Sequence, residues 1–225
     1  YIMGGIKVDA DSQESSIPGL FAAGECAAGI NGANRLGGNS LSDLIVFGKR
    51  AGEYAAQFAK ANAAPKVDQG AVDAAMKASL EPFDRGAAGE NPYQVQFDLQ
   101  DTMQALVGIV RNEAEMQEAV TKLAAFRERA ARVGVDGHRE FNSGWHTGID
   151  LRNLLDVSEA IALSAIERRE SRGGHFREDY PEKMPEFGTF NVAITRQPDG
   201  SMKVSRIPLK EIPAELKQVI EEQKQ

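Results

Sequence analysis

Three consecutive segments each carry one apolar stripe at helical spacing, and this pattern constrains the fold more than any other feature of the chain. An amphipathic helix must bury its stripe, so three in a row are expected to pack together as a helical bundle. The third helix is expected to end at Gly173-Gly174, because glycine commonly follows a helix C-terminus. The stripes are Leu99, Met103, Leu106, Val107 and Val110; then Met116, Val120, Leu123, Ala124 and Ala130; then Leu151, Leu154, Leu155, Ile161, Ala162, Ala165 and Ile166.

The segments that flank the bundle have a different pattern. Residues 1–63 are rich in glycine and poor in charge, with a short strand expected at 6–8 and a buried strand at 19–24. Near the end of the chain, strand-like runs at 189–194 and 202–206 flank Pro198-Asp199-Gly200, which is typical of a β-hairpin. We therefore predict an α+β chain in three parts: 1–63, a spectrin-repeat-like three-helix bundle within 64–180, and a β-hairpin with a tail in 181–225.

Charge and composition exclude several classes of protein. Lys and Arg number 26 against 33 Asp and Glu, a net charge of -7, which gives no attraction to nucleic acid. The single cysteine, Cys26, is expected to be buried and unreactive, and excludes an internal disulfide framework. The three histidines, at 138, 146 and 175, lack a metal-ligand spacing, so we predict no metal site. A cytoplasmic location is the default expectation.

The stretch from residue 31 to residue 41 carries the chemistry. Ser40-Leu41-Ser42-Asp43 has the spacing of a capping box, and the apolar run after it predicts a buried helix that begins near Ser40. A helix N-terminus offers backbone N–H groups and the positive end of a dipole, and Gly37-Gly38 lets another group approach closely. An anionic or electron-rich ligand is expected at this point.

Two charged residues close to this helix start suggest what the ligand is. Glu25 follows the expected strand at 19–24, and a carboxylate at such a strand end commonly holds ribose-like hydroxyls. Arg35 lies in the glycine-rich loop, and its guanidinium can hold a carboxylate by two parallel hydrogen bonds. A polyol with an electron-rich ring fits a flavin, and the arginine predicts a carboxylate substrate beside it.

The same residues resemble a known family. Ala22-Ala23-Gly24-Glu25 and the run from Gly32 to Leu41 resemble the signature of succinate dehydrogenase and fumarate reductase flavoproteins. Residues 1–6 resemble the segment after the family's substrate-binding histidine, and residues 170–175 resemble its Glu-Ser-Arg-Gly-Ala-His motif. The resemblance covers most of the chain, so the first 63 residues are expected to be the C-terminal piece of an FAD-binding α/β domain.

The resemblance implies a role for each matched residue. Glu25 would contact the ribityl or ribose part of FAD, while Asn39, Ser40 and Leu41 would bring the helix N-terminus to the pyrimidine edge of the flavin. Arg35 would clamp a carboxylate of succinate or fumarate. The family also implies an iron-sulfur subunit, membrane anchor subunits and a quinone as partners, and a position on the inner, cytoplasmic face of the membrane.

Some parts of the family pattern are missing from these residues. The chain opens at Tyr1 and contains no G-x-G-x-x-G, so we expect a C-terminal portion that lacks the FAD pyrophosphate site and the acid/base residue and does not catalyse alone. Asn31 stands where the family often has histidine, and the loop between Glu25 and Arg35 is one residue shorter. These departures leave the reaction direction open.

Two alternatives stay open from the sequence. An L-aspartate oxidase-like flavoenzyme shares the arginine-containing signature, although Gly37-Gly38 and the long tail with its hairpin favour the dehydrogenase. The helices between about residues 71 and 174 could instead form a non-catalytic docking module, since a polar outer face fits either function.

Overall fold

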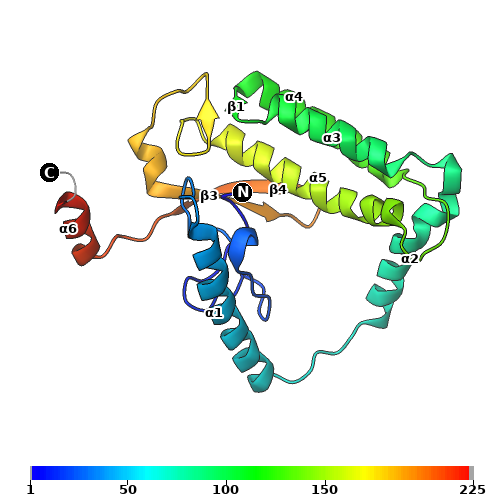
Figure 1. Ribbon diagram of the computed structural model, residues 1–225, viewed down its shortest axis with the longest axis horizontal. Helices are drawn as coiled ribbons and strands as arrows, with labels where there is room; N and C mark the ends of the chain where they lie inside the picture. Colours follow the sequence, from blue (N-terminus) through cyan, green and yellow to red (C-terminus); the bar gives the residue numbers. More distant parts are fainter. Residues whose placement is uncertain (1, 223–225) are drawn as a thin grey trace. The chain divides into compact units, whose positions relative to one another are not determined.

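The structure, a computed structural model, describes residues 2–222 and combines helices with small sheets (Figure 1). The expected α+β class is therefore confirmed. The chain divides into two compact units. The first runs to Glu81 and also includes the distant residues Arg172–His175, and the second takes Pro82–Ser171 and the residues from Phe176 on.

The second unit is built on a three-helix bundle, as the stripes predict. Helices α3 (Pro92–Leu106), α4 (Glu113–Ala131) and α5 (Ser143–Glu167) lie side by side in Figure 1, and each packs on the other two. Burial of the apolar stripes supplies the main stabilisation of this unit. Its core consists of Val95, Leu99, Val107, Met116, Ala119, Leu123, Phe126, Val133, Leu151, Leu155, Ala162 and Ala165.

Each bundle helix begins at an asparagine whose side chain caps it. The Oδ1 atom of Asn91 accepts the N–H of Tyr93 at 2.9 Å, and that of Asn112 accepts the N–H of Glu115 at 3.0 Å. Asn142 does the same for Trp145 at 2.9 Å. Such caps satisfy amides that have no partner within the helix, which explains where the helices begin.

Two predicted helix ends are wrong. Helix α3 stops at Leu106, and Val110 lies instead in β1 (Val110–Arg111), which pairs in parallel with β2 (Phe176–Arg177). Helix α5 stops at Glu167, well before the two glycines, because the side chain of Arg177 donates to the α5 carbonyl of Ala165 at 3.1 Å. A local signal, Gly108, follows the end of α3, whereas the end of α5 is set by a long-range contact.

The predicted hairpin is confirmed, and one helix was not foreseen. Strands β3 (Phe190–Arg196) and β4 (Met202–Pro208) pair antiparallel around the expected turn, and both contact α5. Helix α2 (Gln69–Arg85) lies in a stretch for which the sequence analysis named no helix. The tail forms α6 (Ala214–Glu222), and residues 223–225 of the predicted tail lie outside the described residues.

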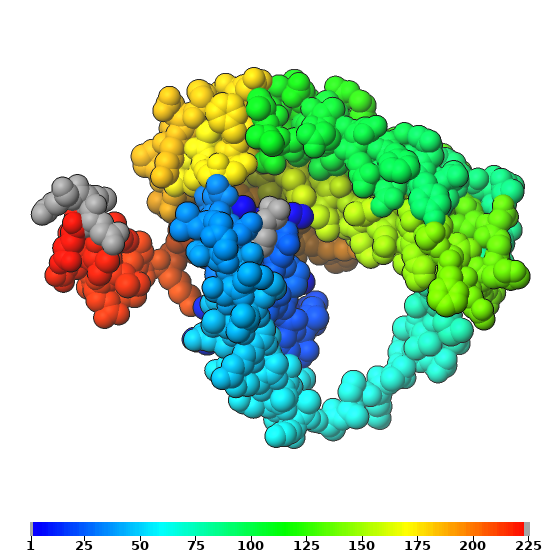
Figure 2. Space-filling view, viewed as in Figure 1, coloured from blue at the N-terminus to red at the C-terminus, as the bar shows by residue number. Residues whose placement is uncertain are grey.

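The first unit has less regular structure than its sequence suggests. The strands expected at 6–8 and 19–24 appear only as isolated bridges, Ile6↔Ala27, Val8↔Ser15 and Glu14↔Phe21, because no further strand among the described residues extends them into a ladder. A short 3-10 helix, η1 (Gly24–Cys26), and the long helix α1 (Asn39–Ala61) follow. Residues 62–68 then form an extended thread, visible in cyan in Figure 2.

The buried environment predicted for α1 is wrong in this structure. The exposed fractions of Leu41, Leu44 and Ile45 are 66%, 50% and 73%. Cys26, expected to be buried, is exposed as well. The apolar side chains of Leu41, Leu44 and Ile45 in the first turns of α1 are thus at least half exposed, although η1 packs against the same helix.

Candidate functional site

The candidate site lies in the first unit, where the segment after η1 leads into α1. Bridge pairing of Ile6 with Ala27 brings the start of the chain beside η1, and η1 packs against α1. Gly24 has a φ of +79° and lies so close to α1 that an added Cβ would meet Leu44 Cδ2 at 2.4 Å. A glycine is needed here to bring Glu25 close to the helix.

Glu25 is an exposed carboxylate on η1. Its Oε1 accepts the backbone N–H of Ile2 at 2.9 Å. This bond ties the carboxylate to the first described residue and holds it on the surface. A charge-assisted bond of this kind orients the side chain.

Arg35 and Ser40 lie in direct contact. The Nη1 atom of Arg35 donates to Ser40 Oγ at 3.3 Å and to the carbonyl of Leu36 at 3.5 Å. The Arg35 side chain is half-buried, and its backbone N–H donates to Asn34 Oδ1 at 2.9 Å. The structure thus brings the predicted substrate residue to the first turn of the predicted cofactor helix.

Helix α1 begins where the sequence predicts, but the capping box is wrong. The N-cap residue is Gly38, with a φ of +87°, and no side chain caps the helix. Ser40 lies inside the first turn and accepts from Arg35, while Asp43 is only 4% exposed. With glycine at the cap, the helix start is formed by the backbone alone.

The surface beside this helix start is open. A Cβ added at Gly37 or Gly38 would have no heavy-atom neighbour within 4 Å, and the side chains of Asn39 and Leu41 are exposed. The N–H groups of Asn39 and Leu41 donate to nearby loop carbonyls at 3.2 Å, the long end of the usual range. A flat ring edge can therefore approach the helix N-terminus, so the residues present fit a flavin.

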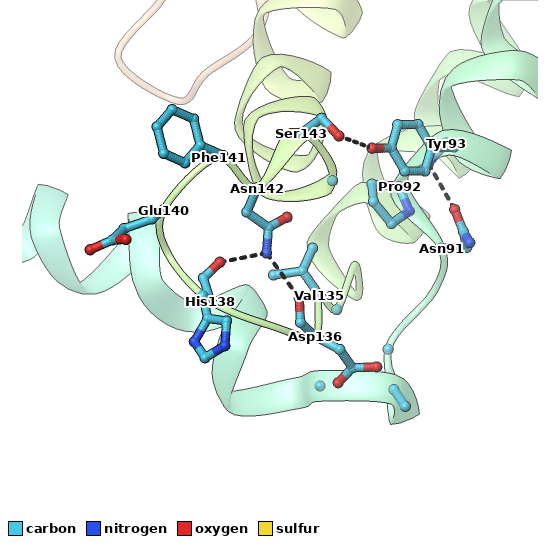
Figure 3. Close-up of a pocket in the computed structure, with 15 residues that line it drawn as sticks. Asn91, Pro92, Tyr93, Val135, Asp136, His138, Glu140, Phe141, Asn142 and Ser143 are labelled. Carbon is cyan, nitrogen blue, oxygen red and sulfur yellow. Dashed lines mark hydrogen bonds between the residues drawn. The ribbon is translucent and has the colours of Figure 1, made fainter.

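One cavity of the structure is lined by residues other than these. It has a volume of about 580 Å³ and lies in the second unit, where Asn142 donates to the carbonyls of Asp136 and His138 and Tyr93 bonds to Ser143 (Figure 3). A smaller cavity of about 280 Å³ lies along α1. Neither cavity is lined by any predicted site residue, so size alone does not identify a site here.

A further contact of the site comes from the segment that follows the bundle in the chain. The N–H of Gly174 donates to the carbonyl of Ala33 at 3.0 Å, and both residues belong to the first unit. For Arg172 and His175 the sequence favours a structural contact back onto the FAD-binding part of the chain over a charged docking surface, and the bond to Ala33 is a contact of that kind. Among residues 2–222, no group of three or more His, Cys, Asp or Glu side chains could hold a metal, and no helix has the length and apolar character to cross a bilayer.

Comparison with protein families identifies the chain. The model of the fumarate reductase flavoprotein C-terminal region matches residues 96–221, more than half of the 225 residues. The chain belongs to this flavoprotein family. The model of an FAD-binding domain matches residues 1–41, which include every residue of the candidate site as predicted from the sequence. The expected family, that of succinate dehydrogenase and fumarate reductase flavoproteins, is confirmed.

Relatives of known sequence and structure agree with this family. The fumarate reductase flavoprotein subunit of Haemophilus influenzae is 47% identical over 188 residues, which is 81% of this chain and 31% of that protein. Mycobacterium smegmatis Sdh1 in complex with UQ1 matches with a TM-score of 0.90 and 46% identity over 98% of this chain and 38% of that one. Escherichia coli quinol fumarate reductase FrdA matches with a TM-score of 0.84 and 34% identity, over 94% of this chain and 37% of FrdA. The chain thus spans about a third of the length of these relatives.

Proposed function

We propose that this chain forms part of the flavoprotein subunit of a succinate dehydrogenase or fumarate reductase, which interconverts succinate and fumarate with FAD. One observation carries the proposal: Arg35 lies against Ser40 at the first turn of α1. The side chain that would bind the carboxylate and the helix start that would bind the ring therefore lie together. The likeness to fumarate reductase and Sdh1 relatives over most of the chain supports the same activity.

Four residues would hold FAD in this proposal. Glu25 would accept hydrogen bonds from the hydroxyls of the ribityl or ribose part, since its carboxylate is exposed on η1. Asn39, Ser40 and Leu41 would present the N-terminal end of α1 to the pyrimidine edge of the ring. The partial positive charge at that end would stabilise negative charge on the ring. FAD, when bound, would supply the hydride acceptor or donor.

Arg35 would bind and orient the dicarboxylate. Its guanidinium offers donors in a planar fork that matches a carboxylate, and Ser40 Oγ holds one of its nitrogens. A fixed arginine places the C2–C3 bond of the substrate in one position relative to the ring, which lowers the entropy cost of reaction. We name no catalytic acid or base among these residues.

The partners follow from the same proposal. Electrons would pass to an iron-sulfur subunit, as the family implies, and the single cysteine of these 225 residues cannot ligate a cluster itself. Membrane anchor subunits and a quinone would complete the assembly at the inner, cytoplasmic face of the membrane. The description of Sdh1 with UQ1 and of FrdA as a quinol fumarate reductase supports the quinone.

Substitution of Arg35 in the full-length subunit tests this function. The charge-assisted hydrogen bonds from Arg35 to a carboxylate are worth about 1.5–3 kcal/mol. Their loss in Arg35→Ala should lower kcat/KM for succinate and fumarate about 10- to 150-fold, with the FAD content unchanged. Arg35→Lys should restore only part of it. Arg50→Ala is the matched control, because Arg50 is a surface arginine of α1 that pairs with Asp11 at 3.5 Å.

The outcomes separate the alternatives. An FAD-loaded Arg35→Ala enzyme with unchanged kcat/KM for both dicarboxylates would remove Arg35 from the substrate site. Oxidation of L-aspartate without turnover of succinate or fumarate would favour the L-aspartate oxidase alternative. A full-length protein that holds no FAD would favour the docking module.

A further inference from the structure

The segment Arg172–His175 forms a tight turn that belongs to the first unit. The N–H of Arg172 donates to the carbonyl of His175 at 2.8 Å, and the N–H of His175 donates back to Arg172 at 3.1 Å. Gly173, the first central residue, has a φ of +61°, a conformation in which glycine carries no steric cost. The turn is therefore a closed, well-defined unit.

This turn touches the loop that carries Arg35. The N–H of Gly174 donates to the carbonyl of Ala33 at 3.0 Å. A Cβ added at Gly173 would lie 2.2 Å from the carbonyl oxygen of Ala33 and 2.8 Å from its Cβ. The two backbones thus pack as closely as glycine allows, at a point two residues before Arg35.

The loop depends on such contacts for its position. Residues 28–38 contain no helix or strand. A chain segment without a ladder or helix of its own is held by individual hydrogen bonds and by packing, and small shifts in it are inexpensive. A displacement of about 1 Å in a substrate-positioning group can lower a rate about 100-fold.

We infer that Gly173 and Gly174 are positioning residues for the substrate site: their turn holds the Ala33 backbone and thereby sets the place of the Arg35 guanidinium. The inference rests on the proposed function, because it assigns a consequence to the position of Arg35. The hydrogen bond from the Gly174 N–H restrains the loop at the Ala33 carbonyl. The missing side chain of Gly173 allows the approach that this bond requires.

Substitution of Gly173 should act on substrate binding more than on the fold. Gly173→Ala places a methyl group against backbone atoms, which cannot rotate away, so the loop must move. Gly200 is the matched control, because it also has a positive φ, +86°, and an added Cβ there would have nothing within 4 Å.

The experiment is a double-mutant cycle in the full-length, FAD-loaded subunit. We expect Gly173→Ala to raise KM for succinate and fumarate and to lower kcat/KM about 10- to 100-fold, while Gly200→Ala changes it less than about threefold. In an Arg35→Ala background, Gly173→Ala should have little further effect. Equal effects of Gly173→Ala with and without Arg35 would overturn the inference.

The cycle also separates this inference from the proposed function. If Arg35→Ala alone leaves kcat/KM unchanged, the proposed function fails first, and the inference falls with it. If Arg35→Ala impairs turnover but Gly173→Ala does not, only the inference fails. A low FAD content in Gly173→Ala would make its kinetics uninformative, so a second measurement on the unchanged protein is included.

That second measurement is hydrogen exchange of the full-length enzyme with and without malonate, a dicarboxylate with a single methylene carbon and therefore no CH2–CH2 bond to oxidise. If the turn and the loop act together, peptides that cover 28–36 and 172–175 should gain protection together when malonate binds. The hairpin turn near Gly200 serves as the internal reference and should not change. Protection of 28–36 without any change in 172–175 would overturn the inference.

Discussion

Arg177 is the buried charge on which the stability of the helical unit should depend most. Its side chain is 0% exposed, and its Nε and Nη2 atoms donate to the two Asp179 oxygens at 2.7 and 2.6 Å. Nη2 also donates to Glu113 Oε2 at 2.8 Å, at the start of α4, and Nη1 to the carbonyl of Ala165 at 3.1 Å, near the end of α5. One side chain therefore joins two bundle helices to the segment that follows them.

The cost of Arg177→Met can be estimated from these contacts. Removing one partner of a buried ion pair costs about 3–5 kcal/mol. Asp179 and Glu113 keep 30% and 38% of their side-chain surface in solvent, so water can rehydrate them and lower that cost. The buried carbonyl of Ala165 loses a donor, which adds about 1–3 kcal/mol. We expect a loss of about 3 kcal/mol in the free energy of unfolding.

Urea unfolding of the 225-residue chain measures this loss. Trp145 is the single tryptophan, and it packs on Phe83 with ring centroids 5.3 Å apart, so its fluorescence reports on the second unit. Arg196→Met is the control, because Arg196 is 68% exposed and lies 3.5 Å from Asp156, a pair worth at most about 1 kcal/mol. A loss for Arg177→Met within about 0.5 kcal/mol of the control would refute the reasoning.

Three further predictions concern pH, cofactor and protection. Arg177 lowers the pKa of Asp179 from 3.8 to about 2, so the ionised carboxylate stabilises the fold above pH 4. As the pH falls towards 2, urea unfolding should show a loss of about 1–2 kcal/mol in the free energy of unfolding, a figure reduced for the contact of Asp179 with solvent. Asp179→Asn should abolish this loss. The 225-residue chain should bind FAD weakly or not at all in a flavin fluorescence titration, because it has no pyrophosphate-binding glycine motif; tight stoichiometric binding would contradict this. Hydrogen exchange should show weaker protection of 1–60 than of the bundle; equal, strong protection in a monomer by light scattering would contradict it.

The bundle could be predicted from the sequence because its determinants are local. Apolar residues such as Leu99, Leu123 and Leu155 recur at helical spacing, and each is at most 2% exposed. The helix ends could not be predicted in the same way. Helix α5 ends where Arg177 reaches its last carbonyls, and this partner is distant enough in sequence that no local rule points to it.

In the first unit, the predictions that depended on neighbouring segments are wrong. The start of α1 was predicted correctly, but from a capping box that the structure does not contain, since Gly38 and not a side chain forms the cap. The short strands expected at 6–8 and 19–24 need neighbouring strands to extend, and a single sequence does not show which neighbours exist. The predicted burial of Leu41 is wrong for the same reason. An apolar run predicts that a helix face can be covered, but it does not show which segment covers it.

The candidate site depends both on local sequence features and on a long-range contact. Glu25, Arg35 and Ser40 could be chosen from one short stretch, because side-chain chemistry and glycine spacing are local, and the contact between Arg35 and Ser40 spans five residues. The position of that stretch could not be predicted in this way. It depends on Gly174, which follows the whole bundle in the chain and donates to Ala33. The chemistry of the site is therefore encoded locally, whereas its placement depends on a turn that is distant in the sequence.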